Sequence, residues 1–347
     1  MKSVKGRGVA YNPKNRFERL ELSLDSSDEF KVRTQYFKDH SKTFITYNKS
    51  PDIGYSASVN PYRGCAHGCA YCYARQTHEY LGFSAGLDFE TKIMVKTDAP
   101  QLLRKELSAK SWQPQIIGFS GVTDIYQPIE RKLGSTRKCL EVFLAFRNPV
   151  RMVTKNHLIL RDLDLIKELA KFDAVSVAIS VTTLDEDLRR VMEPRTSTGQ
   201  NRLKAVSVLA EAGVHVGVLT SPIIPGLTDH ELPALVEASA QAGAKFVEFN
   251  VVHLPFGVKY MFSQWLLAHR PERANKVLNR IRDMRGGQLN DSRFGHRMRG
   301  EGLFAEQIKA LHKAACKKAG LTKSSFSLST KHFRVPGRGV QGTLFDS

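Results

Sequence analysis

Cysteine and long apolar runs are both scarce in this chain of 347 residues. No stretch of about 18 apolar residues occurs, so the sequence predicts no membrane-spanning helix and no membrane partner. The first residues, MKSVKGRGVAYNPKNR, lack the apolar core of a signal peptide. Five cysteines are too few for a disulfide-stabilised scaffold of this size. We therefore expect a cytoplasmic protein whose thiols are reduced.

Acidic residues are also in deficit, with 34 Asp and Glu against 52 Lys and Arg, a net charge of +18. The excess lies at the two ends of the chain. Residues 51–268 carry 24 basic and 22 acidic side chains, whereas residues 269–347 carry 17 and 6, and residues 1–50 carry 11 and 6. Basic flanks are typical of proteins that bind a polyanion such as nucleic acid, but a solvated basic surface has the same composition. The charge leaves both interpretations open.

Three of the five cysteines are concentrated in residues 59–75, VNPYRGCAHGCAYCYAR. Cys65, Cys69 and Cys72 are spaced as C-x3-C-x2-C, which lets a short loop turn three thiolates toward one side. Iron–sulfur clusters usually take four protein thiolates, so three leave one iron without a protein ligand. An open coordination position is typical of reactive metal sites. The segment predicts a reactive cluster with Cys65, Cys69 and Cys72 as metal ligands.

A structural zinc site is the alternative, with His67 as the fourth ligand. Zinc loops usually pair two short halves across a longer spacer, and no second half follows here. His67 is also only two residues from both Cys65 and Cys69, which is tight for a tetrahedral chelate. These points favour the cluster. Cys139 and Cys316 lie in predicted helices and are interpreted as packing residues.

The pattern C-x3-C-x-(aromatic)-C, with Tyr71 as the aromatic residue, resembles the signature of the radical S-adenosylmethionine (radical SAM) superfamily. The longer stretch NPYRGCAHGCAYCYAR is similar to the DNA repair photolyase-like branch, which is related to spore photoproduct lyase. The resemblance implies a [4Fe–4S] cluster whose open iron binds S-adenosylmethionine, and an electron donor of flavodoxin or ferredoxin type. It further implies reductive cleavage to a 5′-deoxyadenosyl radical that abstracts hydrogen from a substrate.

Strand and helix patterns alternate through the middle of the chain, which predicts an α/β fold with a parallel sheet. Strands are predicted at residues 56–62, 91–97, 115–121, 149–155, 174–183, 214–226 and 245–254. The resemblance implies a partial (β/α)6 TIM-type barrel, the radical SAM core, with residues 91–97 as an edge addition. We expect an irregular basic N-terminal arm at 1–54, the core barrel at 55–260, and a basic helical C-terminal extension and tail at 261–347.

Barrel enzymes carry reactive groups after the carboxyl ends of their strands. In the turn SGVTD, Ser120, Gly121 and Asp124 would receive the methionine amino group, as an approximate substitute for the family's Gly-Gly-Glu turn. Lys155 and Arg195 are candidates for the carboxylate. Each of these positions also has a structural interpretation, as a turn residue or an exposed cation.

Two hydroxyl residues and one aromatic residue complete the predicted cofactor site. Ser180 and Thr182 follow the strand at 174–183 and would bind the ribose or the carboxylate, although both are also common helix N-caps. Tyr71 and the backbone of residues 221–226 would lie on opposite sides of the adenine.

The sequence departs from the related lyases at Gly121, where that family is described as keeping a hydrogen-donating cysteine before the T-D pair. The resemblance therefore predicts radical initiation but leaves the reaction, a lyase reaction or other radical chemistry, unassigned. Three functions follow from the sequence: radical SAM chemistry on a nucleic acid, radical SAM modification of a peptide or small metabolite, and a non-catalytic zinc protein that binds nucleic acid.

Overall fold

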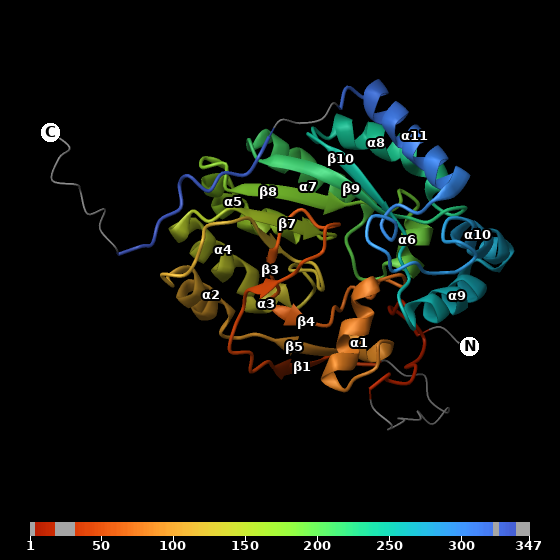
Figure 1. The fold of residues 1–347 in the computed structure, drawn as a ribbon, viewed down its shortest axis with the longest axis horizontal. Helices are drawn as coiled ribbons and strands as arrows, with labels where there is room; N and C mark the ends of the chain where they lie inside the picture. The colour runs from red at the N-terminus through yellow and green to blue at the C-terminus, as the bar shows by residue number, and fades with distance from the viewer. Residues whose placement is uncertain (1–3, 18–31, 322–325, 338–347) are drawn as a thin grey trace.

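The structure, a computed structural model, describes residues 4–17, 32–321 and 326–337. Its centre is a seven-stranded sheet in the order β10-β9-β8-β7-β6-β3-β2 (Figure 1). The six strands from β3 to β10 in this sheet are parallel, and β2 (Thr46–Tyr47) pairs antiparallel with β3 at one edge. The parallel strands are β3 (Ala57–Val59), β6 (Ile117–Phe119), β7 (Val150–Thr154), β8 (Val175–Ser180), β9 (His215–Ile223) and β10 (Val247–Val251).

The β-branched run that forms β8 is buried at every position, as expected for a central strand covered on both faces. The predicted α/β fold with a parallel sheet is confirmed. The sheet order is linear within the described residues, with β10 and β2 at its two ends, in agreement with the predicted partial barrel.

A second sheet of three strands, in the order β1-β5-β4, lies beside the first. It contains β1 (Gln35–Lys38), β4 (Tyr62–Arg63) and β5 (Lys92–Val95). The prediction that residues 91–97 extend the main sheet was therefore wrong, because β5 pairs with β1 and β4 and buries Ile93 and Val95 against Tyr62. Residues 1–54 are also not irregular throughout, since they include β1 and β2. The four residues of β1 are all exposed, so no apolar alternation marked this strand in the sequence.

Helices connect the parallel strands and cover the sheet, and 3-10 helices span Tyr73–Leu81, His157–Asp162 and Asp229–Glu231. The helices up to the last strand are α1 (Leu87–Thr91), α2 (Ala99–Leu107), α3 (Glu130–Leu133), α4 (Ser135–Phe146), α5 (Leu163–Ala170), α6 (Glu186–Met192), α7 (Gly199–Glu211) and α8 (Leu232–Gln241). Cys139 is fully buried in α4, which confirms its packing role.

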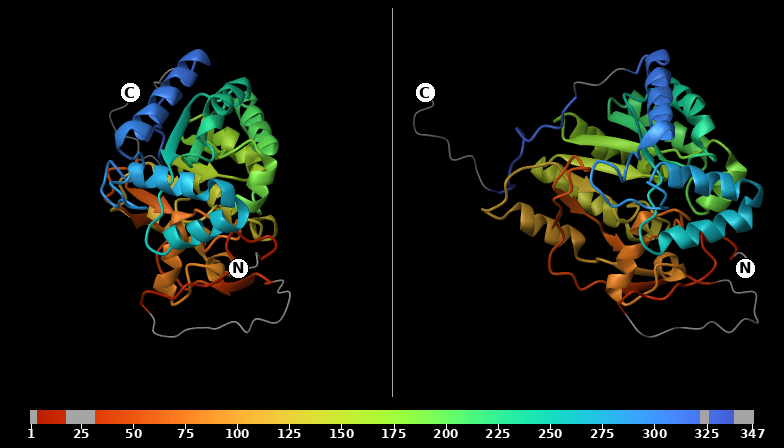
Figure 2. Two further views of the ribbon diagram at one scale, coloured as in Figure 1. Left: turned by 90° about the vertical axis from the view of Figure 1, so that its right-hand side faces the viewer. Right: turned by 45° about the vertical axis from the view of Figure 1, so that its right-hand side comes forward.

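The C-terminal extension begins with α9 (Val258–His269) and α10 (Pro271–Asp283), and α11 (Gly302–Lys318) then packs along α8 (Figure 2). Residues 326–337 run back over α4, where the Arg334 N–H donates to the Phe146 carbonyl at 2.9 Å. In the described part of the chain, no helix has both the length and the apolarity that crossing a bilayer requires.

Candidate active site

The cysteine loop, residues 64–72, follows β3 and β4 at the edge of the main sheet where the parallel strands end. Its thiols form no disulfide; Cys65 and Cys69 are buried, and Cys72 is half-buried. Burial raises the pKa of the Cys69 thiol, and it raises the pKa of Cys72 to about 11. Thiolates at neutral pH therefore need a stabilising positive partner, as a metal centre provides.

A buried ion pair holds the backbone of this loop in place. Arg75 and Glu90 are both fully buried, and Arg75 Nη2 lies 2.5 Å from Glu90 Oε1. The same guanidinium donates to the carbonyl of Cys69, at 3.1 Å from Nε and 2.8 Å from Nη2. The backbone between two cysteines is thus held by a charge that has no access to water.

Residues 4–17, the first described part of the predicted N-terminal arm and called the arm from here on, also contact the loop. The Gly8 N–H donates to Glu90 Oε2 at 3.2 Å, and Arg7 Nη1 donates to the Glu90 carbonyl at 3.0 Å. The arm approaches so closely that a Cβ on Gly8 would lie 1.7 Å from the Gly68 carbonyl oxygen. Only a residue without a side chain fits at position 8, so the arm is part of the wall of the site.

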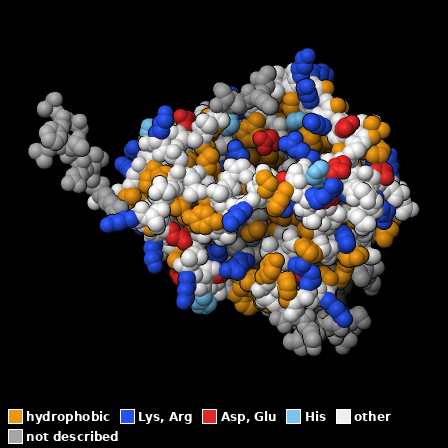
Figure 3. Space-filling view, viewed as in Figure 1, with side chains coloured by type: hydrophobic (Ala, Val, Ile, Leu, Met, Phe, Trp, Pro, Cys, Tyr) orange, Lys and Arg blue, Asp and Glu red, His pale blue; other side chains and the backbone are white. Residues whose placement is uncertain are grey.

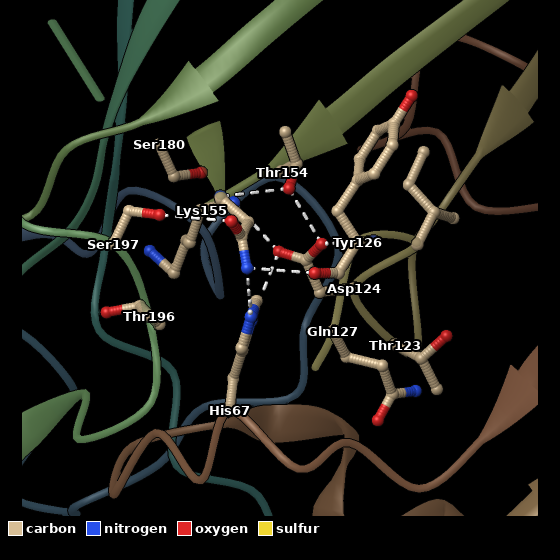
Figure 4. A network of polar contacts seen from close by, with 12 residues as sticks. His67, Thr123, Asp124, Tyr126, Gln127, Thr154, Lys155, Ser180, Thr196 and Ser197 are labelled. Atoms are coloured by element: carbon tan, nitrogen blue, oxygen red, sulfur yellow. Dashed lines mark hydrogen bonds and ion pairs between the residues drawn. The ribbon is translucent and has the colours of Figure 1, made fainter. Parts of the chain in front are cut away.

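Asp124 joins the ends of β6 and β7 to the cysteine loop (Figure 4). Its Oδ1 accepts from Thr154 Oγ1 at 2.7 Å and from the Tyr126 N–H at 2.8 Å. Its Oδ2 accepts from the Lys155 N–H at 2.7 Å and lies 3.3 Å from His67 Nδ1. Burial alone would raise the pKa of Asp124, but His67 and these donors hold it below its usual value. Both carboxylate oxygens are engaged by the protein itself.

A second polar group lies where β8 and β9 end. Lys155 Nζ is 3.0 Å from Thr182 Oγ1, 5.7 Å from the centre of the Tyr71 ring and 3.2 Å from Glu193 Oε1. The Tyr71 hydroxyl also donates to Glu193, whose other oxygen lies 2.5 Å from Arg202 Nη2. Burial opposes a charge on Glu193, yet Arg202 and Lys155 hold the pKa of its carboxyl far below the usual range. Three of the predicted residues, Tyr71, Lys155 and Thr182, are thus brought together.

Glu193 and Arg202, which hold this group together, were not predicted from the sequence. Glu193 precedes Pro194 in a loop, and Arg202 lies in α7, so no local pattern separates them from surface charges. Their pairing across eight intervening residues, Glu193 to Arg202, is a contact that only the folded chain creates.

The turn after β6 faces the cysteine loop with an unusual backbone. Ser120 has φ 127° and Gly121 has φ 122°, and the Gly121 carbonyl accepts from the Tyr73 hydroxyl. A Cβ on Gly121 would meet nothing within 4 Å, and Val122 packs against the small cluster of Cys65, Ala74 and Phe89. A non-glycine residue in this φ range is strained, and such strain is concentrated at functional sites.

Two other predicted residues have different surroundings. Ser180 is buried, and its carbonyl accepts from Arg202 Nη1 at 3.0 Å. Arg195 turns toward the arm, where its Nε donates to the Gly6 carbonyl at 3.2 Å and its Nη1 lies 3.4 Å from Thr34 Oγ1. Its guanidinium thus ties the arm to the loop that follows α6.

The donor set fits a cluster better than a single ion. His67 directs its ring nitrogens to Asp124 and to Asn156 Nδ2, 3.3 Å from Nε2. Ligands of one zinc ion all lie within about 2.3 Å of it, whereas each thiolate of a cluster binds a different iron. Cys65, Cys69 and Cys72 would hold such a cluster.

The fold and site are those of a class of enzyme in which a three-cysteine loop follows the first strand of a parallel α/β sheet. Residues 59–238 match the radical SAM superfamily, and the chain belongs to that superfamily. It is a radical SAM enzyme, and the superfamily uses a [4Fe–4S] cluster and S-adenosylmethionine.

An uncharacterized protein of Mycobacterium tuberculosis is 37% identical over 242 residues, covering 68% of this chain and 70% of its own length. An uncharacterized protein of Methanocaldococcus jannaschii is 31% identical over 200 residues, covering 57% of this chain and 71% of its own. Among solved structures, spore photoproduct lyase complexed with dinucleoside spore photoproduct matches with a TM-score of 0.60 and 17% identity, over 82% of this chain and 79% of that one. This likeness establishes the fold.

Proposed function

We propose that this enzyme holds a [4Fe–4S] cluster through Cys65, Cys69 and Cys72 and uses S-adenosylmethionine to abstract hydrogen from a nucleic acid. The observation that carries the proposal is the convergence of three free thiols with the Ser120–Gly121 turn and the Lys155 group at one edge of the sheet. When bound, the reduced cluster supplies the electron that splits S-adenosylmethionine into methionine and a 5′-deoxyadenosyl radical.

The protein's own part is to bind and orient. The backbone carbonyls of the turn at Ser120 and Gly121 receive the ammonium group, because this turn adjoins the cysteine loop through Val122 on the Cys65 cluster and through the bond from Tyr73 to Gly121. Lys155 provides the cation for the carboxylate, at the cost of sharing its charge with Glu193.

The remaining contacts follow from where the side chains lie. We assign the hydroxyl groups of Ser180 and Thr182 to the ribose or the carboxylate, and the Tyr71 ring to the adenine. Asp124 acts as a positioning residue, since its oxygens already join His67 to the ends of two strands. Arg195 has no place in this set because it contacts the arm.

A nucleic-acid substrate is supported by the basic flanks and by the fold shared with a lyase solved with a dinucleoside photoproduct. The lyase reaction itself is not proposed, because position 121 carries no thiol. The cluster needs a one-electron donor of flavodoxin or ferredoxin type, and a reducing, cytoplasmic environment keeps the three thiols available.

Hydrogen transfer from the substrate tests the proposal. Reconstituted enzyme is incubated without oxygen with S-adenosylmethionine, dithionite and deuterated single-stranded or duplex DNA or RNA. We expect deuterium in the 5′-deoxyadenosine, no product from Cys65→Ala, and an active Cys139→Ala control. Cleavage of S-adenosylmethionine without deuterium transfer from any of these polymers would exclude the nucleic-acid substrate and favour a peptide or small metabolite.

A further inference from the structure

Exposed aromatic side chains gather beside the segment that follows the cysteine loop. Phe17, Tyr80 and Phe256 are 57%, 72% and 53% exposed. The rings of Phe17 and Tyr80 stack at 5.2 Å between centroids with a 25° interplanar angle. The Arg16 guanidinium carbon lies 3.8 Å from the centre of the Phe256 ring and 5.1 Å from that of Phe17. We call this row of Tyr80, Phe17, Arg16 and Phe256 the stacking surface.

Local contacts hold the row in place. The Phe17 N–H donates to Asn15 Oδ1 at 2.7 Å in a turn, and Arg16 Nε pairs with Glu79 Oε2 at 2.6 Å. Phe256 has φ 47°, a left-handed conformation that is a genuine outlier for a bulky residue. Rings fixed before a ligand arrives lose little freedom on binding, which favours affinity.

Packing of the arm does not explain these rings. A side chain whose role is to staple the arm to the body would be buried by that contact. Each of these three rings instead leaves more than half of its surface in water. Clustered apolar surface with a charged neighbour is typical of an interaction site.

The row lies on the side of the sheet that carries the chemistry. Tyr80 is in the 3-10 helix that begins directly after Cys72, and Phe256 is in the loop that follows the carboxyl end of β10. In Figure 3, hydrophobic and Lys or Arg side chains adjoin one another over the region where α9 meets the 73–81 helix. The 73–81 helix therefore joins the row to the segment that carries the three thiols.

We propose that the stacking surface binds unpaired bases of a nucleic acid and leads the strand toward the cysteine loop. Every base presents a π-face, and proteins that bind single strands combine aromatic platforms with cations along the backbone path. Lys259, three residues after Phe256 in the chain, supplies a cation, with its Nζ 5.1 Å from the centre of the ring of Tyr260, which is 62% exposed. Glu79, the carboxylate within the row, is 5% exposed and paired, so a phosphate meets little repulsion. The inference rests on the proposed nucleic-acid substrate.

Oligonucleotide binding by matched ring variants is the test. The probes are a fluorescent single-stranded DNA and the same sequence as RNA, a DNA duplex, and heparin as a polyanion without bases. Tyr80→Ala and Phe256→Ala should each weaken single-strand binding by about fivefold to 100-fold. The salt dependence should stay unchanged, because no phosphate contact is lost. Tyr80→Phe should restore binding, and Tyr47→Ala on β2, a ring 63% exposed, should bind as the wild type does.

A cation variant separates stacking from charge. Lys259→Ala should lower the slope of log affinity against log salt by about 0.7, the value for one phosphate contact on a single strand. Its loss of affinity should therefore disappear at high salt, unlike that of the ring variants.

Different outcomes overturn different claims. If the wild type binds single strands and both ring variants bind equally well, the stacking surface is wrong and the proposed substrate stands. A second contrary result has two parts: heparin displaces the single strand equally well from the wild type and the ring variants, and the duplex binds the wild type as tightly as the single strand does. Binding would then be by charge alone, and the stacking surface is wrong. If the wild type binds none of the nucleic acids at low salt, the nucleic-acid part of the proposed function fails as well.

Discussion

The cysteine loop and the C-terminal extension carry their charges in opposite ways. Around the loop, Arg75–Glu90 and Arg202–Glu193 are ion pairs with almost no exposed surface. In the extension, Arg293 is 60% exposed and shares its charge with Asp291 at 2.7 Å. Removing one partner of a buried pair leaves an uncompensated charge, whereas an exposed pair contributes little. Charge pairs therefore fix geometry near the site, whereas the exposed pairs of the extension are made in water and contribute little to stability.

Replacing Arg75 by Ala should show the difference between buried and exposed pairs most strongly. Glu90 would be left charged and without water, so we expect a loss of about 3–5 kcal/mol in the free energy of unfolding. Urea denaturation of the apoprotein measures it. The double variant Arg75→Met with Glu90→Gln should recover part of the loss, and a single-variant cost as small as that of a surface pair would contradict the account.

His78 gives the buried region a pH dependence. Burial lowers the pKa of this ring to about 4 in the folded protein. As pH falls, the His78 ring of the unfolded chain takes up a proton near pH 6.5, before the ring of the folded chain does. The contribution of the neutral ring to the free energy of unfolding is therefore complete above about pH 6.5 and is lost as pH falls toward 4.

Between about pH 6.5 and pH 4 the wild type should lose about 3 kcal/mol of its free energy of unfolding through His78, and the His78→Phe variant should lack this loss. The measurement is denaturant unfolding at a series of pH values, compared as the difference from wild type. The exposed His40 offers the matched control, His40→Gln, which leaves the buried ring in place. A His78→Phe profile parallel to that of the wild type would show that the ring is protonated in the fold.

The Gly8→Ala variant tests the arm as a wall of the site. Its Cβ would overlap the Gly68 carbonyl oxygen, so the arm must shift, at a cost of about 1–3 kcal/mol. We expect a lower unfolding midpoint and faster proteolysis within residues 4–17. Gly257→Ala is the control, because a Cβ there meets nothing within 4 Å. Equal behaviour of the two variants would mean that the arm is not held against the loop.

The smallest effect is expected on the exposed flank. Arg293→Ala removes contacts to Asp291 and Glu301 that are made in water. The midpoint of thermal unfolding should therefore stay where it is in the wild type. A shift comparable to that of Gly8→Ala would show that the flank, too, depends on its charges for stability.

Local sequence patterns were sufficient for the six parallel strands of the main sheet. The run AVSVAISVTT forms the buried strand β8, and the cysteine spacing marks a loop at the strand ends, as parallel-strand logic requires. These features depend on neighbouring residues, so a window of the sequence contains the signal.

Contacts between segments far apart in the sequence could not be predicted from local patterns. Arg75 finds Glu90 and Lys155 finds Glu193 only because the chain folds back, and each looks like a surface charge in the sequence. Position 8 is a similar case, since nothing local in the sequence shows that this glycine packs closely on the cysteine loop. The second sheet was missed because exposed β1 lacks an apolar period.

The central claim is that three thiolates hold a cluster that cleaves S-adenosylmethionine, and one anaerobic assay tests it directly. Reconstituted wild-type protein should contain about four iron and four sulfide per chain and, with dithionite, convert S-adenosylmethionine to 5′-deoxyadenosine. Cys65→Ala, Cys69→Ala and Cys72→Ala should each abolish the product, while Cys139→Ala retains it. About one zinc per chain with no iron, or cleavage that survives in the three variants, would contradict the account.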